Sequence, residues 1–346
     1  MERKMATIRK IDNILPIEGA DLIEAIKIGG WTVVAQKSMG YKINDLVVYC
    51  EIDSFIPTEI APFLTRAGHF PKEYQGIKGE RLRTKKLRGV ISQGLLLPLE
   101  TLTNFPSDQW FDTSPFEGSD VSSLLGITKW NPPAEFQSPD AKGLFPSFIP
   151  KTDQERIQNL SKDFQKWKEE GTIWEVTEKL DGSSMTVFYN GGQIGVCSRN
   201  LELKEDENNT FWKAAKSNGA TSVLTNKGRN LALQGELIGP GIQGNKYNLT
   251  DHVYFVYDIF DIDKQSYFLP EERQAFCKDA FLNHVPVLNH VHFTKDSTET
   301  IEDVLKSAEG KSVAGSKPER EGLVYKSYKT QDSFKAISNK WLCKFE

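Results

Sequence analysis

The sequence predicts an α+β protein in which a small all-β barrel precedes a domain of antiparallel sheets with flanking helices. Length and composition support two packed domains: the chain has 346 residues, 38% of them hydrophobic, including 20 Phe, 10 Tyr and 7 Trp. In the first part of the chain, short strand-like runs are separated by glycine turns. After residue 150, strand-like runs alternate with helical runs.

The barrel is expected over residues 1–130. Strand-like runs cover residues 22–28, 31–35, 45–50 and 90–98, with glycine-containing turns between them. No helical periodicity in this part is long enough for a helix bundle. Such spacing is typical of a small closed barrel.

A basic segment, residues 78–88, lies between these runs and contains six Lys or Arg side chains. On a single strand, Arg81, Arg83 and Lys85 would alternate onto one face and form a stripe able to contact phosphates. The alternative is a solvated edge strand that its charge protects from aggregation.

Prolines mark the expected boundary between the domains. A Pro-rich linker is expected at residues 131–150, and the second domain at 151–346. Residues 152–159 are expected to begin a helix capped by Thr152 or Asp153. Further on, strands are expected at 174–177, 185–189, 252–257 and 322–325, helices at 211–217, 271–282 and 301–307, and a flexible loop at 310–319.

Charge and cysteine content limit the classes to which this protein can belong. The formal net charge is −4, so a nucleic-acid binder of this composition must gather its basic residues locally. The four cysteines are scattered, which argues against a structural zinc site and a disulfide framework. No run of about 18 apolar residues and no signal peptide is present, so we expect a soluble intracellular protein without a membrane association.

An ordered series of short motifs carries most of the functional information. Residues 178–184 read Glu-Lys-Leu-Asp-Gly-Ser-Ser. The series continues with Ser-Arg-Asn at 198–200, Gly-Glu-Leu at 235–237, Tyr-Asp-Ile at 257–259, Glu-Gly-Leu-Val-Tyr-Lys at 321–326 and Phe-Lys-Ala-Ile at 334–337. In its order and spacing this series resembles the covalent nucleotidyltransferase superfamily of ligases and capping enzymes.

Within that superfamily the chain is most similar to ATP-dependent RNA ligases with an N-terminal OB-fold module. Residues 235–243, Gly-Glu-Leu-Ile-Gly-Pro-Gly-Ile-Gln, resemble a segment of phage RNA ligases, and residues 40–50 and 87–98 resemble OB-fold modules of tRNA-binding proteins. DNA ligases and capping enzymes place a further OB domain after the last lysine motif, and the printed sequence ends eleven residues beyond Lys335.

The resemblance implies that Lys179 is the nucleophile, which forms a covalent lysyl-AMP with ATP. A lysine is protonated at neutral pH, so its attack requires a lowered pKa. Arg199, Lys335 and a divalent metal would supply the positive charge if the fold brings them together. AMP then passes to an RNA 5′-phosphate, and a 3′-OH displaces it.

The resemblance also implies a metal site and a nucleotide site. Glu236, Glu321 and Asp181 are the expected ligands of Mg²⁺ or Mn²⁺, which prefers oxygen ligands. Tyr257 is expected to stack on adenine, with Phe260 as the alternative. The full set expected to bind the nucleotide is Arg156, Val176, Glu178, Lys179, Arg199, Glu236, Tyr257 and Lys335, and Ile337 stands where RNA ligases often have a second lysine.

Several interpretations stay open from the sequence. RNA with 5′-phosphate and 3′-OH ends is the expected partner, in RNA repair, including nicked duplex, and a monomer is expected. The alternatives are a DNA ligase, a capping guanylyltransferase, or a catalytically inactive OB-fold protein that only binds RNA.

Overall fold

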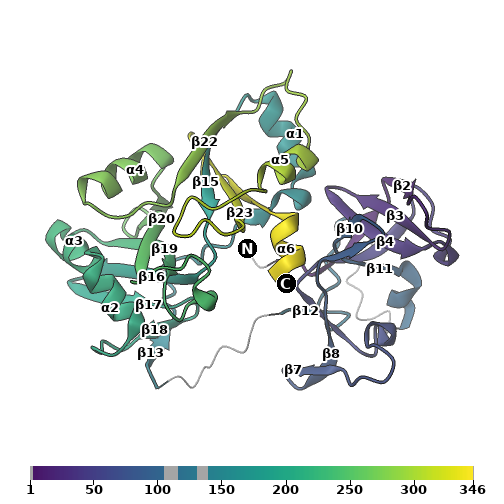
Figure 1. Ribbon diagram of the computed structural model, residues 1–346, viewed down its shortest axis with the longest axis horizontal. Helices are drawn as coiled ribbons and strands as arrows, with labels where there is room; N and C mark the ends of the chain where they lie inside the picture. The colour runs from purple at the N-terminus through teal and green to yellow at the C-terminus, as the bar shows by residue number, and fades with distance from the viewer. Residues whose placement is uncertain (1–2, 105–115, 131–138, 346) are drawn as a thin grey trace. The chain divides into compact units, whose positions relative to one another are not determined.

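The computed structural model describes residues 3–104, 116–130 and 139–345 (Figure 1). It divides the chain into two units, one of Met1–Pro132 with Leu342–Glu346 and one of Pro133–Trp341. The predicted fold class, an all-β part followed by an α+β part, is confirmed. None of the helices in the described part of the chain has the length and apolar character needed to span a bilayer.

The first unit consists of short antiparallel strands with no α-helix among its described residues up to 130. The sheet orders are β1-β5-β11, β2-β3-β4 and β12-β6-β8-β7, and β9 pairs with β10 as a separate hairpin. Residues from different strands, such as Ile8, Val48 and Ile56, face a common core. The bounds are β1 Ala6–Lys10, β2 Asn13–Pro16, β3 Ile23–Ile28, β4 Trp31–Gln36, β5 Leu46–Cys50, β6 Ser54–Pro57, β7 Lys72–Tyr74, β8 Ile77–Arg81, β9 Lys85–Leu87, β10 Val90–Ser92, β11 Leu95–Pro98 and β12 Thr128–Lys129.

The run at residues 90–98, expected as one strand, is two strands with Gly94 between them. Gly94 has φ +116°, and a Cβ at this position would lie 2.4 Å from the Tyr49 ring. Only glycine fits this close approach, which lets the chain turn from β10 into β11.

The basic segment does not form the single strand expected for it. Arg81 is the last residue of β8 and forms an ion pair with Asp53, whereas Lys85 begins β9. The exposed basic residues of this segment are Lys78, Arg83, Lys85, Lys86 and Arg88, and the last three lie around the β9–β10 turn. We call β9, β10 and their turn the basic hairpin.

The second unit contains two sheets with flanking helices. The seven-stranded sheet has the order β13-β18-β17-β16-β19-β20-β21, and the five-stranded sheet has the order β14-β24-β23-β15-β22. All pairings are antiparallel except the short parallel pair β14–β24. The bounds are β13 Ala141–Leu144, β14 Glu155–Arg156, β15 Ile173–Lys179, β16 Ser183–Asn190, β17 Gln193–Cys197, β18 Leu201–Leu203, β19 Leu231–Ile238, β20 Val253–Asp261, β21 Ser266–Tyr267, β22 Val287–His292, β23 Gly322–Ser327 and β24 Ser333–Ile337.

Helices cover both sheets of this unit (Figure 1). Trp212 of α2 and Leu224 of α3 pack on the seven-stranded sheet, and Trp167 of α1 and Val304 of α5 pack on the five-stranded one. The helix bounds are α1 Ser161–Glu169, α2 Thr210–Ser217, α3 Ala220–Lys227, α4 Pro270–Asp279, α5 Ile301–Ser307 and α6 Asn339–Phe345.

Local capping explains where two of these helices begin. The Asn209 side chain accepts hydrogen bonds from the backbone N–H groups of Phe211 and Trp212 at the start of α2. At α5, Thr300 and Asp303 form a reciprocal capping box. The helices expected at 211–217 and 301–307 are therefore present.

The helix expected at residues 152–159 is wrong. This segment contains β14 and a single 3₁₀ turn, Ile157–Asn159, and α1 begins only at Ser161. Pairing of β14 with β24 satisfies its backbone and overrides the apparent cap. Within the expected linker, Ala141–Leu144 forms β13 at the edge of the seven-stranded sheet, and residues 131–138 lie outside the described residues.

Candidate active site

Residues from both sheets of the second unit line a cavity of about 110 Å³. Six residues predicted from the sequence are among them: Glu178, Lys179, Arg199, Glu236, Tyr257 and Lys335. The others are Thr152, Asp153, Gln154, Thr177, Leu180, Ser184, Val285, Val324 and Lys326. Motifs that are far apart in the sequence thus meet in one place.

Strand register brings Lys179 to Glu321. Lys179, the last residue of β15, pairs with Gly322 at the start of β23, so Glu321 precedes it on the neighbouring strand. The Lys179 Nζ lies 2.8 Å from one oxygen of the Glu321 carboxylate and 2.9 Å from the other. The candidate nucleophile is therefore held in an ion pair.

Carboxylates set the charge state of Lys179 in this structure. Burial lowers the pKa of Lys179, but the negative charges of Glu321, Glu236 and Asp181 together raise it by more. The pKa therefore lies above its ordinary value. The pKa of Lys179 is thus raised, whereas the nucleophilic amine was expected to have a pKa lowered by Arg199, Lys335 and a divalent metal together. The amine is kept protonated until the charge of its surroundings changes.

Glu236 lies opposite Ser184 in the β16–β19 pairing and accepts a hydrogen bond of 2.9 Å from the Gly182 N–H. A Cβ at position 182 would lie 2.3 Å from the Leu237 carbonyl oxygen, so this approach needs glycine. Burial raises the pKa of Glu236 to about 8, against the opposing effect of the Lys179 ammonium. The positive charge near Glu236 thus does not compensate for the burial of its carboxyl group.

Asp181 is held by two residues of the loop that follows β19. Its carboxylate forms an ion pair with Lys246, and its backbone N–H donates to the Tyr247 Oη at 2.7 Å. The Lys246 ammonium also lies 4.9 Å from the centre of the Trp341 ring. Lys246 and Tyr247 were not predicted, because nothing in their spacing distinguishes them from other loop residues.

The predicted metal ligands form an oxygen donor set that now holds lysine ammonium groups. Glu321 pairs with Lys179 and Asp181 with Lys246. Among the described residues, no three Asp, Glu, His or Cys side chains converge closely enough to bind a metal directly. The oxygen donors of the set are of the type that Mg²⁺ prefers, and Mg²⁺ usually keeps several of its waters.

Two cationic side chains meet a third residue, Asp153. The Lys335 Nζ lies 2.9 Å from one Asp153 oxygen, and an Arg199 nitrogen lies 3.6 Å from the other. Lys335 is buried, whereas the Arg199 side chain is 56% exposed. A phosphate entering the cavity would replace the Asp153 carboxylate as their anionic partner.

Tyr257 lines the cavity, and its position is fixed at both ends. Its hydroxyl is 2.9 Å from the Thr152 Oγ1, and its carbonyl accepts a hydrogen bond of 2.6 Å from the Lys326 Nζ. Burial raises the pKa of Tyr257 to about 12, so the ring stays neutral. The alternative, Phe260, packs in the core beside Phe188 and does not line the cavity.

Glu178 and Val176 lie on the same strand in different surroundings. Glu178 is buried, lines the cavity, and accepts a hydrogen bond of 3.0 Å from the Val313 N–H through one oxygen. Its other oxygen has no hydrogen-bond partner among the described residues. Val176 packs in the core with Trp174 and is not part of the cavity wall.

Arg156 lies one step behind the cavity wall. It is buried on β14, in register with Lys335 of β24, and does not line the cavity. Its place beside Lys335 is compatible with a supporting role. A direct contact with a nucleotide stays a prediction for both Arg156 and Val176.

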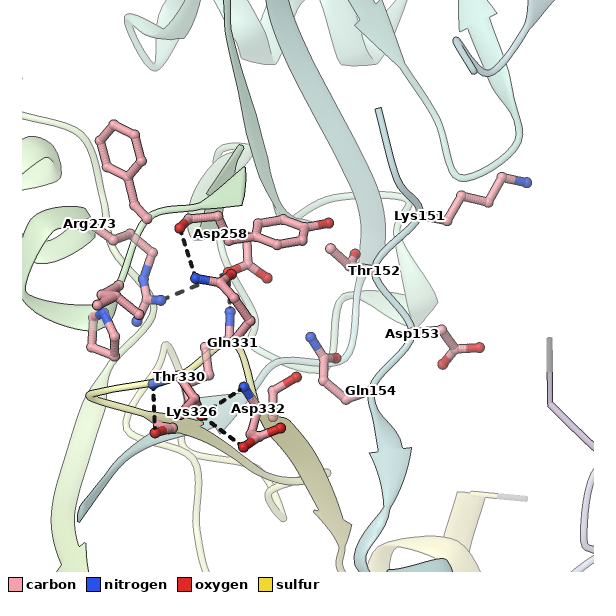
Figure 2. Close-up of a pocket in the computed structure, with 16 residues that line it drawn as sticks. Lys151, Thr152, Asp153, Gln154, Asp258, Arg273, Lys326, Thr330, Gln331 and Asp332 are labelled. Atoms are coloured by element: carbon pink, nitrogen blue, oxygen red, sulfur yellow. Dashed lines mark hydrogen bonds and ion pairs between the residues drawn. The ribbon is translucent and has the colours of Figure 1, made fainter. Parts of the chain in front are cut away.

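A second cavity, of about 160 Å³, adjoins the first and shares Thr152, Asp153, Gln154 and Lys326 with it. Figure 2 shows Lys326, Asp258 and Arg273 pointing toward one another across this cavity.

A network of buried ion pairs lies beside this cavity. Lys326 pairs with Asp258, and Arg273 pairs with Glu175 and lies 3.8 Å from Asp258. Burial lowers the pKa of Lys326 to about 8, although Asp258 opposes the shift. The network fixes the backbone of Tyr257. The alternation of β23, with Val324 and Lys326 facing the cavity, could have identified Lys326 from the sequence.

Comparison with known protein families gives two matches. A model described as RNA ligase matches residues 172–340, and a model described as an OB-fold domain matches residues 5–99. A comparison with curated protein sequences gave no significant match.

Solved structures similar to this chain include several of Naegleria gruberi RNA ligase. A mutant with ATP and Mn is 44% identical, with 98% of each chain covered and a TM-score of 0.88. A mutant with AMP and Mn is 43% identical over 98% of each chain, with a TM-score of 0.88. The protein with PPi is 44% identical over 98% of each chain, with a TM-score of 0.86.

Proposed function

The chain belongs to the RNA ligase family, and we propose that the cavity around Lys179 is where it uses ATP to join RNA ends. One observation carries the assignment of the site. A lysine amine, Lys179, stands in the wall of a cavity that an aromatic ring, Tyr257, and two phosphate-binding cations, Arg199 and Lys335, also line. The Naegleria gruberi structures with ATP, AMP and PPi support this proposal.

The reaction of an ATP-dependent RNA ligase consists of three displacements at phosphorus. In the first, the neutral Lys179 Nζ forms a bond to the α-phosphorus of ATP, and the bond to the bridging oxygen breaks, releasing pyrophosphate. In the second, an RNA 5′-phosphate oxygen attacks the same phosphorus and frees the lysine. In the third, an RNA 3′-OH attacks the 5′-phosphorus, forms the phosphodiester and releases AMP. One cavity can serve all three steps.

Different residues of the cavity bind different parts of the nucleotide. Tyr257 stacks on the base, and the unpartnered oxygen of Glu178 accepts a hydrogen bond from its amino group. Lys335 and Arg199 release Asp153 and bind the α-phosphate, where negative charge builds up during the displacement.

Glu236, Glu321 and Asp181 are the residues that would hold a divalent cation. Bound there, Mg²⁺ or Mn²⁺ supplies positive charge beside the α-phosphate and the amine. The donor set fits because Glu321 and Asp181 already hold cations and Glu236 is short of positive charge. Neutralising Glu321 removes the main cause of the raised pKa of Lys179, which favours the nucleophilic amine.

We propose that the two parts of the chain divide the work. The part at 151–346 carries the chemistry and the part at 1–130 holds RNA as an OB-fold module, while β13 of the expected linker 131–150 belongs to the seven-stranded sheet. Within the first part, the basic hairpin offers three exposed cations to phosphates.

The finer features of the substrate and setting are further proposals. A nicked duplex is the preferred substrate, because it presents a 3′-OH beside a 5′-phosphate, and the enzyme acts as a monomer. The buried thiols of Cys50, Cys197 and Cys277, which form no disulfide in the described part of the chain, support a reducing, intracellular setting.

Sealing assays with two kinds of substrate test the proposal. The parent protein should join a nicked RNA duplex with a 3′-OH and a 5′-phosphate when ATP and Mg²⁺ or Mn²⁺ are present. Lys179→Ala should not join these ends, yet it should seal an RNA whose 5′ end already carries AMP, because that step does not use the lysine. Joining of the 5′-phosphate ends by Lys179→Ala would exclude the covalent mechanism. Use of GTP instead of ATP would favour a capping enzyme.

A further inference from the structure

Within residues 310–319, which were expected to form a flexible loop, residues 311–319 form a closed loop with defined bonds, which we call the clasp. Its ends are joined by an isolated Lys311–Glu319 bridge, an ion pair of 2.7 Å between the same two side chains, and a Ser312 N–H bond of 2.8 Å to the Pro318 carbonyl. The clasp is therefore held in a fixed shape at its base.

The tip of the clasp is connected to residues on either side of Lys179, directly to Glu178 and through Tyr247 to Asp181. On one side, the Val313 N–H donates to the Glu178 carboxylate at 3.0 Å. On the other side, the Ser316 N–H donates to the Tyr247 carbonyl at 2.7 Å. Tyr247 in turn accepts from the Asp181 N–H.

Close packing fixes how the clasp lies against this loop. Gly315 has φ +51°, and a Cβ there would lie 2.1 Å from the Tyr247 carbonyl oxygen. Ala314 packs in a small apolar cluster with Leu180, Tyr247 and Val285. A displacement at the tip must therefore break several contacts at once.

The bond from Val313 leaves Glu178 with one occupied and one available oxygen. The available oxygen is buried, Glu178 lines the cavity, and a carboxylate oxygen accepts hydrogen bonds only. A 6-amino group, as in adenine, supplies the missing donor, whereas a 6-oxo group would place two acceptors against each other. If the carboxylate turned, neither oxygen would keep this role.

We propose that the clasp is a positioning element for nucleotide selection: the Val313 N–H holds Glu178 so that its second oxygen distinguishes a 6-amino from a 6-oxo purine. This inference rests on the proposed use of ATP at this site. Val313 itself does not touch the nucleotide. It acts through Glu178.

Val313→Pro removes the N–H donor, and Val313→Ala is its matched control, because Ala keeps the N–H and the Val313 side chain is 52% exposed. Lysine adenylylation by ATP and by ITP is measured as separate kcat and KM values. Val313→Pro should raise KM for ATP about tenfold or more and lower the ATP-to-ITP ratio of kcat/KM to a similar extent, with ITP little changed. Val313→Ala should behave like the parent.

A second pair of variants covers the case in which the proline variant does not fold. Gly315→Ala should displace the clasp and lower the same ratio. Gly191→Ala has a similar φ, +56°, but meets nothing within 4 Å, and should leave the ratio unchanged. In a Glu178→Ala background, Gly315→Ala should have no further effect on the ratio, because the two residues act in series.

The outcomes separate this inference from the proposed function. No labelling of the parent by ATP would contradict the proposed function itself. A parent that is labelled by ATP, with a ratio insensitive to Val313→Pro and Gly315→Ala, would overturn the role of the clasp alone. Equal losses with ATP and ITP would also overturn it, since they would indicate a structural role.

Discussion

Replacing Glu321 by glutamine should lower the pKa of Lys179 in the metal-free protein. Both carboxylate oxygens lie within 2.9 Å of the ammonium, and the side chains are 27% and 12% exposed. At 2.8 Å Coulomb's law gives about 1.5 kcal/mol at the dielectric constant of water and about 6 kcal/mol at an effective value of about 20. Removing this charge should therefore destabilise the protonated amine by at least about 1.5 kcal/mol, and the pKa of Lys179 should fall.

The assay is the pH dependence of the reaction of Lys179 with an amine-specific reagent in the presence of EDTA, read by peptide mass spectrometry. The reagent attacks only the neutral amine, so the midpoint of the rate profile reports the pKa. Glu205→Gln is the control, because this carboxylate is exposed and pairs with Lys216 instead. Adding Mn²⁺ to the parent should shift the midpoint in the same direction. An unchanged midpoint in Glu321→Gln would refute the assignment of Glu321 as the group that keeps Lys179 protonated.

Four further predictions concern Glu236, the buried network and RNA binding. Glu236→Gln should lower lysine adenylylation by about 10²-fold or more, because electrostatic groups at such sites contribute several kcal/mol; parent-like rates would remove Glu236 from the site. The metal-free parent should lose thermal stability as the pH rises from about 4.5 to about 8, because the pKa of Glu236 is raised on folding, and Glu236→Gln should weaken this dependence. Arg273→Met should lower the free energy of unfolding by about 3–5 kcal/mol, since it leaves Glu175 buried and unpaired; an unchanged denaturant midpoint would show that Glu175 is otherwise satisfied. Replacing the three basic residues of the basic hairpin by alanine should reduce the salt dependence of RNA binding by up to about three units of slope, with ATP labelling unchanged; an unchanged slope would place the RNA on another surface.

The predicted residues that line the common cavity lie mostly on strands. Lys179 is the last residue of β15, and Glu236 and Tyr257 lie inside β19 and β20, where a charged or polar residue within a strand pattern is informative. The order of the motifs then allows their meeting in one cavity to be anticipated.

The residues that sequence reasoning missed depend on irregular segments and long-range packing. Asp153 and Lys246 lie outside regular strands and helices, and no periodicity marks them. Glu175 looks like one more polar residue on an alternating strand, but Arg273 of α4 covers it and makes it a buried ion. Such burial depends on the tertiary arrangement, which local patterns do not specify.

The same limit explains the errors in the fold. The helix expected at 152–159 had a plausible cap, but parallel pairing with β24 decided its structure. Residues 310–319 were expected to form a flexible loop, whereas the clasp within them is bonded to Glu178 and Tyr247, more than 60 residues away in the sequence.

Covalent labelling tests the central claim most directly. Protein incubated with Mn²⁺ and ATP labelled at the α-phosphate, then denatured and separated by electrophoresis, should retain the label, and peptide mapping should place the AMP on Lys179. Lys179→Ala should carry none. Label at another residue, or label that persists in Lys179→Ala, would contradict the account.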